Sequence, residues 1–235
     1  MELDLETTSQ IKINNQISCL KEKVLIHLED LGFTFDDNGN LYISQEDKNE
    51  IKKVHRFARK IALQKREKFI NRSTRKFSAY FANGYDVIPE KVSPIAVEVN
   101  TKQENDLFSF SRLTWSLPFS KGFGRRIRYL VFDQSNDKLI GILGLQSPPL
   151  DFAIRDHLFC YPKDKKTFFV NQMMDIQTLG AIPPYNILLG GKLVAMLAGS
   201  KEIRDCYRRK YSNKVTIMEE RKIPSHLVAL TTTSA

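Results

Sequence analysis

The fold is decided by a stretch of the chain that reads RIRYLVF at 126–132, DQSNDK at 133–138 and LIGILGL at 139–145. The two outer runs are rich in apolar, β-branched and aromatic residues. The six polar residues between them are of the kinds that form turns. This order predicts an antiparallel β-hairpin.

Beyond the hairpin, the sequence continues as a strand and two helices. Residues 168–179 have the composition of a strand, and 188–198 form an apolar pattern of helical length. A second helix is predicted over 200–211, begun by a capping serine, and a last strand over 227–233. The segment from Arg125 to Tyr211 is therefore predicted to be one α/β unit, with a site for a phosphate-bearing ligand.

The N-terminal part of the chain predicts a helical module. Residues 16–31 carry apolar side chains at helical spacing, and 33–43 predict a short hairpin around an Asn-Gly turn. The next segment, 44–69, predicts one long amphipathic helix. Ser44 begins it, and Asp47 three residues later forms a variant of the capping box.

The residues after that helix predict a boundary. Pro and polar residues over 83–105 favour a loop, and 107–115 is compatible with a short helix or a strand. We expect the chain to divide into a basic, helical module with a small hairpin over 1–82 and an α/β domain over 83–235.

Composition excludes several classes of protein. The chain has 235 residues, of which 42% are apolar, enough for an ordinary globular core. It has no apolar run of membrane-spanning length and an acidic N-terminus where a signal peptide is basic, so we expect a cytoplasmic protein that does not enter a membrane. Its three cysteines lie far apart, which predicts neither disulfides nor a metal site.

The net charge of +9 is concentrated in one segment. Between Lys48 and Lys76 there are twelve basic residues and two acidic ones, and 12 − 2 gives an excess of +10. Such a run is often only the solvated face of a helix, but its one-sided charge favours contact with nucleic acid, most simply DNA. The residues expected to make this contact are Lys52, Lys53, Arg56, Arg59 and Lys60, with Arg125 and Arg126 from the segment before the central hairpin.

A glycine pair opens the apolar helix over 188–198. Gly190 and Gly191 each cost about 0.5–1 kcal/mol there relative to alanine, so we expect a compensating function. Free N–H groups at a helix start attract anions, and Lys192 adds a full charge. The alternative is that the glycines allow close packing on the sheet. Asn186, just before them, could cap this helix or bond a ligand amide, and capping is expected.

The order of hairpin, strand and glycine-led helix resembles the acetyltransferase superfamily to which the histone acetyltransferases belong. The resemblance implies an α+β fold in which the helical module is followed by an acetyltransferase-like mixed, mostly antiparallel sheet flanked by helices. It also implies that acetyl-CoA or a related CoA thioester binds near Asn186, Gly190, Gly191 and Lys192. Tyr207 stands where the superfamily often has an aromatic general acid. The superfamily's glycine motif is not met, since Ile187 and Lys192 occupy two of its defining positions.

A second resemblance covers nearly all of residues 66–235. Several motifs in the same order are similar to the DruA family of the Druantia anti-phage defence systems: YFANG (80–84), LTWSLP (113–118), GFGRR (122–126), IRD (154–156), LGAIPPYN (179–186), LGGKL (189–193) and the terminal TTTSA (231–235). The resemblance implies bacterial anti-phage defence with partner defence proteins, such as a helicase. The family's longer members continue past this last motif, so we expect the chain to be a piece of a longer protein.

Three residues are candidates for proton transfer: Tyr207, Asp156 and Tyr185. Asp156 lies beside Arg155 and is alternatively a buried partner of it, and the neighbouring His157 is a weaker candidate. No Ser-His-Asp order, phosphate-binding loop or HExxH motif is present. We therefore expect a defence protein whose acetyltransferase-like domain binds nucleic acid and modifies or senses it. The alternative is a non-catalytic DNA-binding scaffold that recruits partner proteins, and the sequence leaves open whether the chain is an enzyme.

Overall fold

The computed structural model of the chain describes residues 2–30, 33–42, 48–115, 124–216, 220–222 and 225–232, those of 2–15, 48 and 50–54 by their backbone alone. The described residues form two compact units. The first lies within 1–67, together with Trp115, and the second within 68–114 and 124–232. The predicted division between residues 82 and 83 falls inside the second unit and stays a prediction about domains.

The first unit has two helices and a small hairpin. Helix α1 runs from Glu2 to Asp30, strands β1 (Thr34–Phe35) and β2 (Leu41–Tyr42) pair antiparallel, and helix α2 spans Lys48–Gln64. Asp36 accepts backbone N–H bonds inside the hairpin loop, where Gly39 has a φ of 76°. The predicted helix and hairpin are confirmed, whereas the predicted cap at Ser44 and Asp47 lies outside the described residues.

The second unit is built on a five-stranded sheet with the order β3-β4-β5-β6-β7. Its strands are β3 (Pro94–Glu98), β4 (Arg126–Asp133), β5 (Lys138–Gln146), β6 (Met173–Ala181) and β7 (Ala229–Thr231). All neighbours are antiparallel except β6 and β7, which run parallel because two helices connect them. The hairpin predicted at 126–145 is confirmed as β4 and β5, and the chain has a mixed, mostly antiparallel α+β fold.

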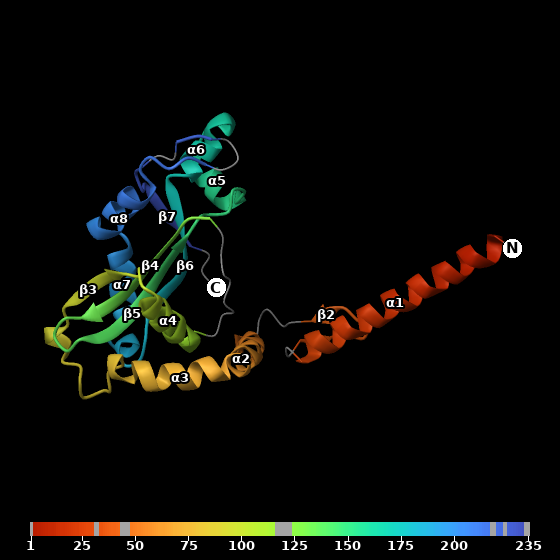
Figure 1. Cartoon of the computed structure of the whole chain (residues 1–235), viewed down its shortest axis with the longest axis horizontal. Helices are drawn as coiled ribbons and strands as arrows, with labels where there is room; N and C mark the ends of the chain where they lie inside the picture. The colour runs from red at the N-terminus through yellow and green to blue at the C-terminus, as the bar shows by residue number, and fades with distance from the viewer. Residues whose placement is uncertain are drawn as a thin grey trace. The chain divides into compact units, whose positions relative to one another are not determined.

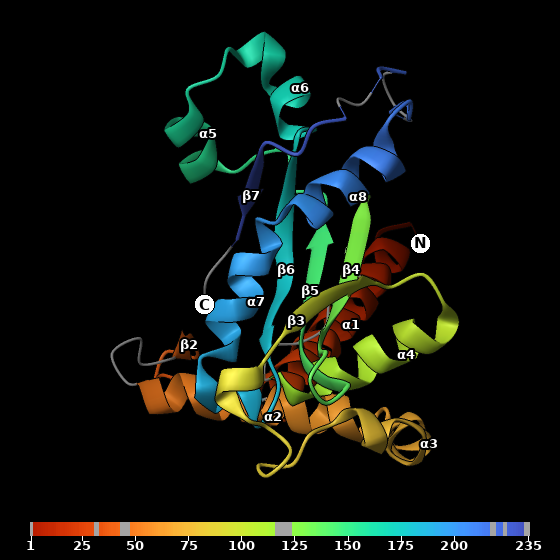
Figure 2. The same cartoon turned by 90° about the vertical axis from the view of Figure 1, so that its left-hand side faces the viewer.

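Helices cover both faces of this sheet (Figures 1 and 2). Helices α7 (Gly190–Ala198) and α8 (Lys201–Tyr211) pack on one face, and α4 (Lys102–Ser111) packs on the other. On β5, a Cβ added at Gly141 would meet Val194 of α7, while one added at Gly144 would meet Phe108 of α4. Alternate residues of the strands therefore feed two apolar layers.

The larger layer lies between the sheet and the helices α7 and α8. Alternate residues of β4 point into it, and Val194 and Ile203 fill it from the two helices without exposed surface. On the other face, α3 (Glu67–Phe77) joins α4 through the rings of Phe77 and Phe110, whose centroids are 6.2 Å apart. Each fully buried apolar side chain of this size contributes roughly 1.5–3 kcal/mol, so the core fixes the sheet that positions the site.

The single long helix predicted over 44–69 is wrong. The chain has two helices there, because α2 ends at Gln64 and α3 begins at Glu67. Between them the N–H of Arg66 bonds the carbonyl of Leu63, a three-residue bond that tightens the last turn and ends the helix. The basic run is thereby divided between the two units.

The loop predicted over 83–105 is also wrong in its second half. Residues 94–98 form β3, an edge strand whose first residue is a proline, where a missing N–H is tolerated. A capping box of Thr101 and Glu104 then begins α4, and the segment 107–115 that was compatible with either element is helical up to Ser111.

The strand predicted from residue 168 begins only at Met173, since α6 occupies Lys166–Val170. The connection before it contains helix α5 (Ala153–Phe159), which carries Asp156 and His157. The helices predicted over 188–198 and 200–211 are confirmed as α7 and α8, and the last strand is confirmed as the shorter β7.

Candidate functional site

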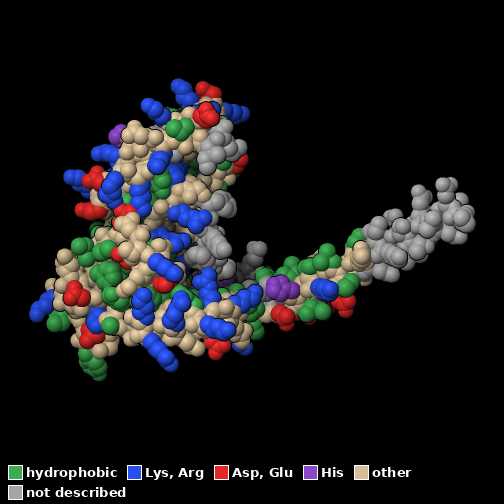
Figure 3. Space-filling view, viewed as in Figure 1, with side chains coloured by type: hydrophobic (Ala, Val, Ile, Leu, Met, Phe, Trp, Pro, Cys, Tyr) green, Lys and Arg blue, Asp and Glu red, His purple; other side chains and the backbone are tan. Residues whose placement is uncertain are grey.

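Helix α3 presents a row of basic side chains on its outer side. These are Lys68, Arg72, Arg75 and Lys76. Their spacing of four, three and one places them along one side of the helix, while Ser73 and Phe77 on the opposite side are buried. All four are exposed, and none forms a salt bridge with another described residue. Figure 3 shows Lys and Arg side chains gathered over this helix.

The basic row borders a groove between α3 and α4. The groove has a volume of about 410 Å³ and is lined by Arg72, Ser73, Lys76, Phe77, Lys102, Gln103 and Asp106. A neighbouring hollow of about 480 Å³ shares Arg72 and Lys76 and adds Arg75. The rings of Phe69 and Phe77 lie 5.8 and 5.2 Å from the charged groups of Arg72 and Lys76. A concave surface with these cations suits a phosphate backbone.

The basic residues predicted on the preceding helix lie in the first unit. Lys52 and Lys53 belong to α2, but their side chains are outside the described part of the structure. Arg56, Arg59 and Lys60 are exposed, at a spacing that puts them along one side of α2. They form a basic surface on the first unit.

Arg125 differs from these residues, because its guanidinium is engaged inside the second unit. It donates to the carbonyls of Asn171, at 2.5 Å, and Met173, at 3.2 Å, and to the hydroxyl of Tyr207. It also lies 5.5 and 5.8 Å from the rings of Tyr207 and Tyr211. The guanidinium that the sequence analysis expects to contact nucleic acid is therefore already bonded within the protein. The neighbouring Arg126 has an exposed side chain, and its backbone bonds Tyr211.

Tyr207, the predicted general acid, is fully buried. Its hydroxyl donates to the carbonyl of Asn171 at 2.5 Å and accepts from Arg125. Burial raises the pKa of Tyr207 and Arg125 partly offsets this. The side chain therefore ties α8 to the starts of β4 and β6 and exposes no surface through which to meet a ligand.

Tyr185 is buried in a separate network at the β4–β5 turn. Its hydroxyl lies 2.9 Å from the carboxylate of Asp133 and accepts from the amide of Asn136 at 2.9 Å. Burial and the carboxylate raise the pKa of Tyr185 to about 12, although the bond from Asn136 opposes them. The tyrosine thus fastens the turn before α7 to the central hairpin.

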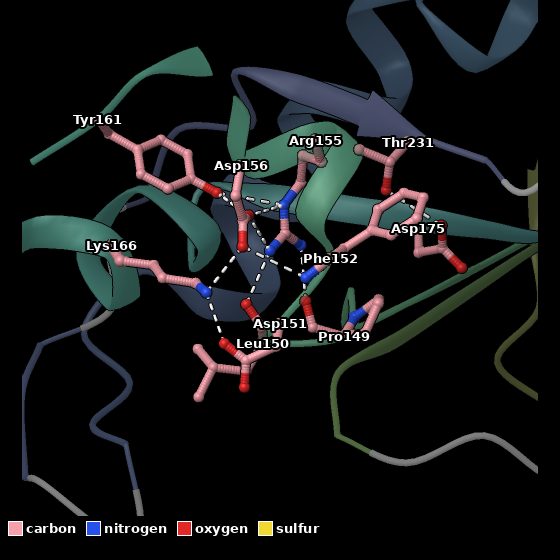
Figure 4. A network of polar contacts seen from close by, with 10 residues as sticks. All are labelled: Pro149, Leu150, Asp151, Phe152, Arg155, Asp156, Tyr161, Lys166, Asp175 and Thr231. Atoms are coloured by element: carbon pink, nitrogen blue, oxygen red, sulfur yellow. Dashed lines mark hydrogen bonds and ion pairs between the residues drawn. The ribbon is translucent and has the colours of Figure 1, made fainter. Parts of the chain in front are cut away.

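Asp156 lies in a third network, on α5 (Figure 4). Arg155, whose side chain is 1% exposed, donates to its carboxylate at 2.6 Å. The same guanidinium donates to the carbonyls of Pro149 and Leu150 at 2.6 and 2.7 Å. Asp156 is thus the partner of Arg155, as one of the two alternatives had it, but the buried residue of the pair is Arg155, and the side chain of Asp156 remains 21% exposed.

Two further side chains complete this network. Lys166 bonds the second oxygen of Asp156 at 2.7 Å, and the hydroxyl of Tyr161 donates to the first. Burial acts to raise the pKa of Asp156, but the bonds from Lys166, Tyr161 and Arg155 outweigh it and hold this pKa well below its usual range. The carboxylate therefore stays charged and fixes α5 against α6.

The structure does not bring the three predicted acid–base residues together. Tyr207 is bonded beside the start of β4, through Arg125, and Tyr185 is bonded at its end, through Asp133. Eight residues of strand separate these two positions, which corresponds to about 25 Å. Asp156 belongs to neither network, so no shared reaction centre links the three.

The glycine pair at the start of α7 has two different environments. A Cβ on Gly190 would lie 2.6 Å from the carbonyl oxygen of Tyr185 and 2.9 Å from Cβ of Ala181, so this glycine is needed for packing. A Cβ on Gly191 would meet nothing within 4 Å. Lys192 is exposed beside it. The space beside the Cα of Gly191 is thus open, and the predicted phosphate site at this helix start stays a prediction.

The residue that caps α7 is Leu189 and not Asn186, so the predicted capping role of Asn186 is wrong. Asn186 lies one turn earlier, exposed in the 3-10 turn Tyr185–Leu188. Leu189 has a left-handed backbone, with a φ of 60°. Its side chain offers no acceptor to the helix.

A second, apolar groove lies beside this capping residue. It has a volume of about 310 Å³ and is lined by Pro89, Val92, Pro94, Tyr185, Leu188, Leu189, Gly190, Lys192, Leu193 and Met196. Leu189 and Met196 remain 74% and 70% exposed. Figure 3 shows hydrophobic side chains gathered on this side of the molecule, over β3 and the start of α7.

Sequence reasoning missed several of these residues. Lys102 enters the basic groove because Thr101 and Glu104 start α4, and that capping box was legible in the sequence. Tyr161 and Lys166 join Asp156 through the fold of α5 and α6, for which the sequence has no local signal.

Among the residues that the structure describes, no group of three or more His, Cys, Asp and Glu side chains could hold a metal ion. In the same part of the chain, every helix is too short or too polar to cross a membrane.

Comparison with known proteins finds one family over most of the chain. The family described as Druantia protein DruA matches residues 45–235. A curated relative, the Druantia protein DruA of Escherichia coli (strain UMEA 4076-1), is 40% identical over 226 residues, which are 96% of this chain and 56% of the relative. The chain thus spans little more than half the length of that relative. No solved structure matches it.

Proposed function

The chain belongs to the DruA family of the Druantia anti-phage defence systems, and from this membership we propose that it acts in defence by binding nucleic acid. The basic row of α3 and the groove between α3 and α4 form the binding surface. The observation that carries the proposal is the set of exposed cations around this groove. Arg72, Arg75, Lys76 and Lys102 form no salt bridge with another described residue, although Asp106 also lines the groove.

Cations arranged in this way bind phosphates and release counterions, so the affinity falls steeply with salt and depends little on base sequence. DNA is the proposed ligand. Arg56, Arg59 and Lys60 of α2 are proposed as a phosphate-binding surface of the first unit.

The test is a titration of fluorescently labelled duplex DNA at several salt concentrations. Replacing Arg72 and Lys76 together by glutamate should weaken binding about a hundredfold and reduce the salt slope by about two, since each lost phosphate contact reduces it by about one. Lys163→Glu with Lys165→Glu makes the same charge change at exposed positions of the second unit and is the matched control. Equal losses in both double variants would refute the α3 surface.

The internal bonds of Tyr207, Tyr185 and Asp156 support a binding role over catalysis by these residues. In this form of the proposal the protein holds DNA and recruits partner defence proteins, such as a helicase. Protection of cells from phage should then depend on Arg72 and Lys76 and be retained when the buried hydroxyl of Tyr207 is removed in a folded Tyr207→Phe variant.

A second candidate function is transfer of an acyl group by an acetyltransferase-like domain. It is favoured by the open space at Gly191 and the exposed Lys192, which lie in the first turn of α7, the first of the two helices between the parallel strands β6 and β7. Calorimetry with acetyl-CoA tests it. Wild-type protein should release heat on binding acetyl-CoA, and Gly191→Val should abolish this heat because the valine side chain would occupy the open space. The variant should still fold, because a Cβ at Gly191 meets no atom within 4 Å. No heat at millimolar acetyl-CoA would end this candidate and leave DNA binding untouched.

A further inference from the structure

We propose that the apolar groove at the start of α7 docks a segment of another protein that carries a large apolar side chain beside a carboxylate. This inference rests on the recruiting role proposed above and gives it a surface. The groove is the hollow of about 310 Å³ whose rim includes Leu189, Met196 and Lys192.

Leu189 is the first argument for a partner. Its φ of 60° lies in the left-handed region, which glycine and asparagine adopt readily and a bulky side chain adopts at a cost in free energy. Its carbonyl accepts from the N–H groups of Lys192 and Leu193, as any residue at the start of a helix can, but its side chain bonds none of the amides of α7. Its side chain is 74% exposed and so gains little from burial within the chain. Nothing local compensates for leucine at this position, whereas a partner that covers it would.

The surroundings of Leu189 are the second argument. Ile187 and Met196 are 80% and 70% exposed, and Pro89, Val92 and Pro94 also line the groove. Exposed apolar surface gathered around a hollow marks protein interaction sites, and methionine adapts to the shape of what it contacts. The volume lies at the lower end for ligand pockets, which fits one or two anchoring side chains.

Charge identifies the kind of partner. Among the described residues, Lys192 is the only charged one that lines the groove, and it forms no salt bridge with any of the others. A carboxylate next to the apolar anchor would satisfy it. A second copy of this chain is a poorer fit, because a symmetric contact would bring the Lys192 side chains of two chains with a net charge of +9 together. The occupant is therefore an acidic, apolar segment of a different protein.

The experiment selects binders from a displayed library of short random peptides on the whole chain. The selected peptides should combine a large apolar residue with Asp or Glu. Leu189→Asn should weaken them about tenfold and keep or raise the melting temperature, because asparagine accepts the left-handed backbone. Leu158→Asn removes an equally exposed leucine, at 76%, from α5; it should leave peptide binding unchanged and should not raise the melting temperature, because asparagine is a poorer helix former than leucine. Selection on Lys192→Glu should favour basic peptides instead.

Four results would overturn the docking surface. They are a selection without enrichment, equal effects of Leu189→Asn and Leu158→Asn, displacement of the peptides by acetyl-CoA, and self-association of the chain that Leu189→Asn abolishes.

DNA titration of the same variants separates this inference from the proposed function. Affinity for DNA is governed by Arg72 and Lys76 and should not change with Leu189, so either proposal can fail without the other.

Discussion

Arginine has opposite tasks in two regions of the second unit. On α3, Arg72 and Arg75 are exposed and face solvent without an acidic partner. Beside the sheet, Arg125 donates to two carbonyls and a tyrosine, and Arg155 donates to two carbonyls and a carboxylate. A count of formal charge treats all four alike. The comparison teaches that a net charge overstates what a polyanion can contact, because the internal partners decide which cations are available.

The largest effect should come from breaking the buried member of this comparison. Arg155→Met keeps an unbranched, largely apolar side chain but leaves two carbonyls unbonded and removes one of the three partners of Asp156, so it should lower the free energy of unfolding by about 3 kcal/mol. Urea denaturation measures this.

Arg72→Met is the control for that experiment. It makes the same substitution at an exposed position, where about 0.5 kcal/mol or less is expected. DNA affinity should show the reverse order, falling with Arg72→Met and staying constant for folded Arg155→Met. Similar stabilities for the two variants would contradict the distinction between buried and exposed arginines.

A smaller effect should appear in the dependence of stability on pH. The bonds to Asp156 place its pKa in the folded state below the usual value of 3.8, so the charged carboxylate stabilises the fold at neutral pH. This contribution is lost as the pH falls below about 4 toward the folded-state pKa, because the unfolded chain then binds the proton more tightly. The stability difference between wild type and Asp156→Asn should therefore be largest near pH 7 and shrink in acid.

Urea titrations from pH 7 down to pH 3 follow this difference. Asp164→Asn makes the same change of charge on the exposed surface of the same region and serves as the control. A constant difference between wild type and Asp156→Asn across the range would show that the carboxylate gains nothing from its partners.

The sequence predicted the parts of the molecule whose signals are local. The hairpin of β4 and β5 is legible because alternation and turn residues stand side by side, and the apolar helix α7 follows from its composition. The strand β3 was missed because only five residues follow the proline-rich loop and their pairing comes from β4, more than thirty residues later. Local pattern thus predicts elements whose signals are strong and does not predict strand pairing or the short elements that depend on it.

The contacts and backbone conformations of individual site residues were harder to predict, because they depend on parts of the chain that local pattern does not connect. Arg125 meets Tyr207 82 residues along the chain, and no spacing rule connects them. Gly190 is explained by a contact with the Tyr185 carbonyl that exists only after the prolines turn the chain. The left-handed backbone of Leu189 could not be predicted from the sequence, because leucine is not a residue that favours this conformation.

The smallest effect should come from one exposed cation at a time. Arg75→Gln removes a single charge from the row on α3, so DNA affinity should fall about threefold and the salt slope by about one, with stability unchanged. Arg208→Gln is the matched control, since Arg208 is exposed on α8 and has only a weak contact of 3.9 Å with Asp205. Salt titrations of labelled DNA compare the two. If both variants lose affinity alike, DNA senses the total charge of the chain and the α3 surface has no special part. If only Arg75→Gln loses affinity, the position of a cation matters more for DNA binding than the total number of cations.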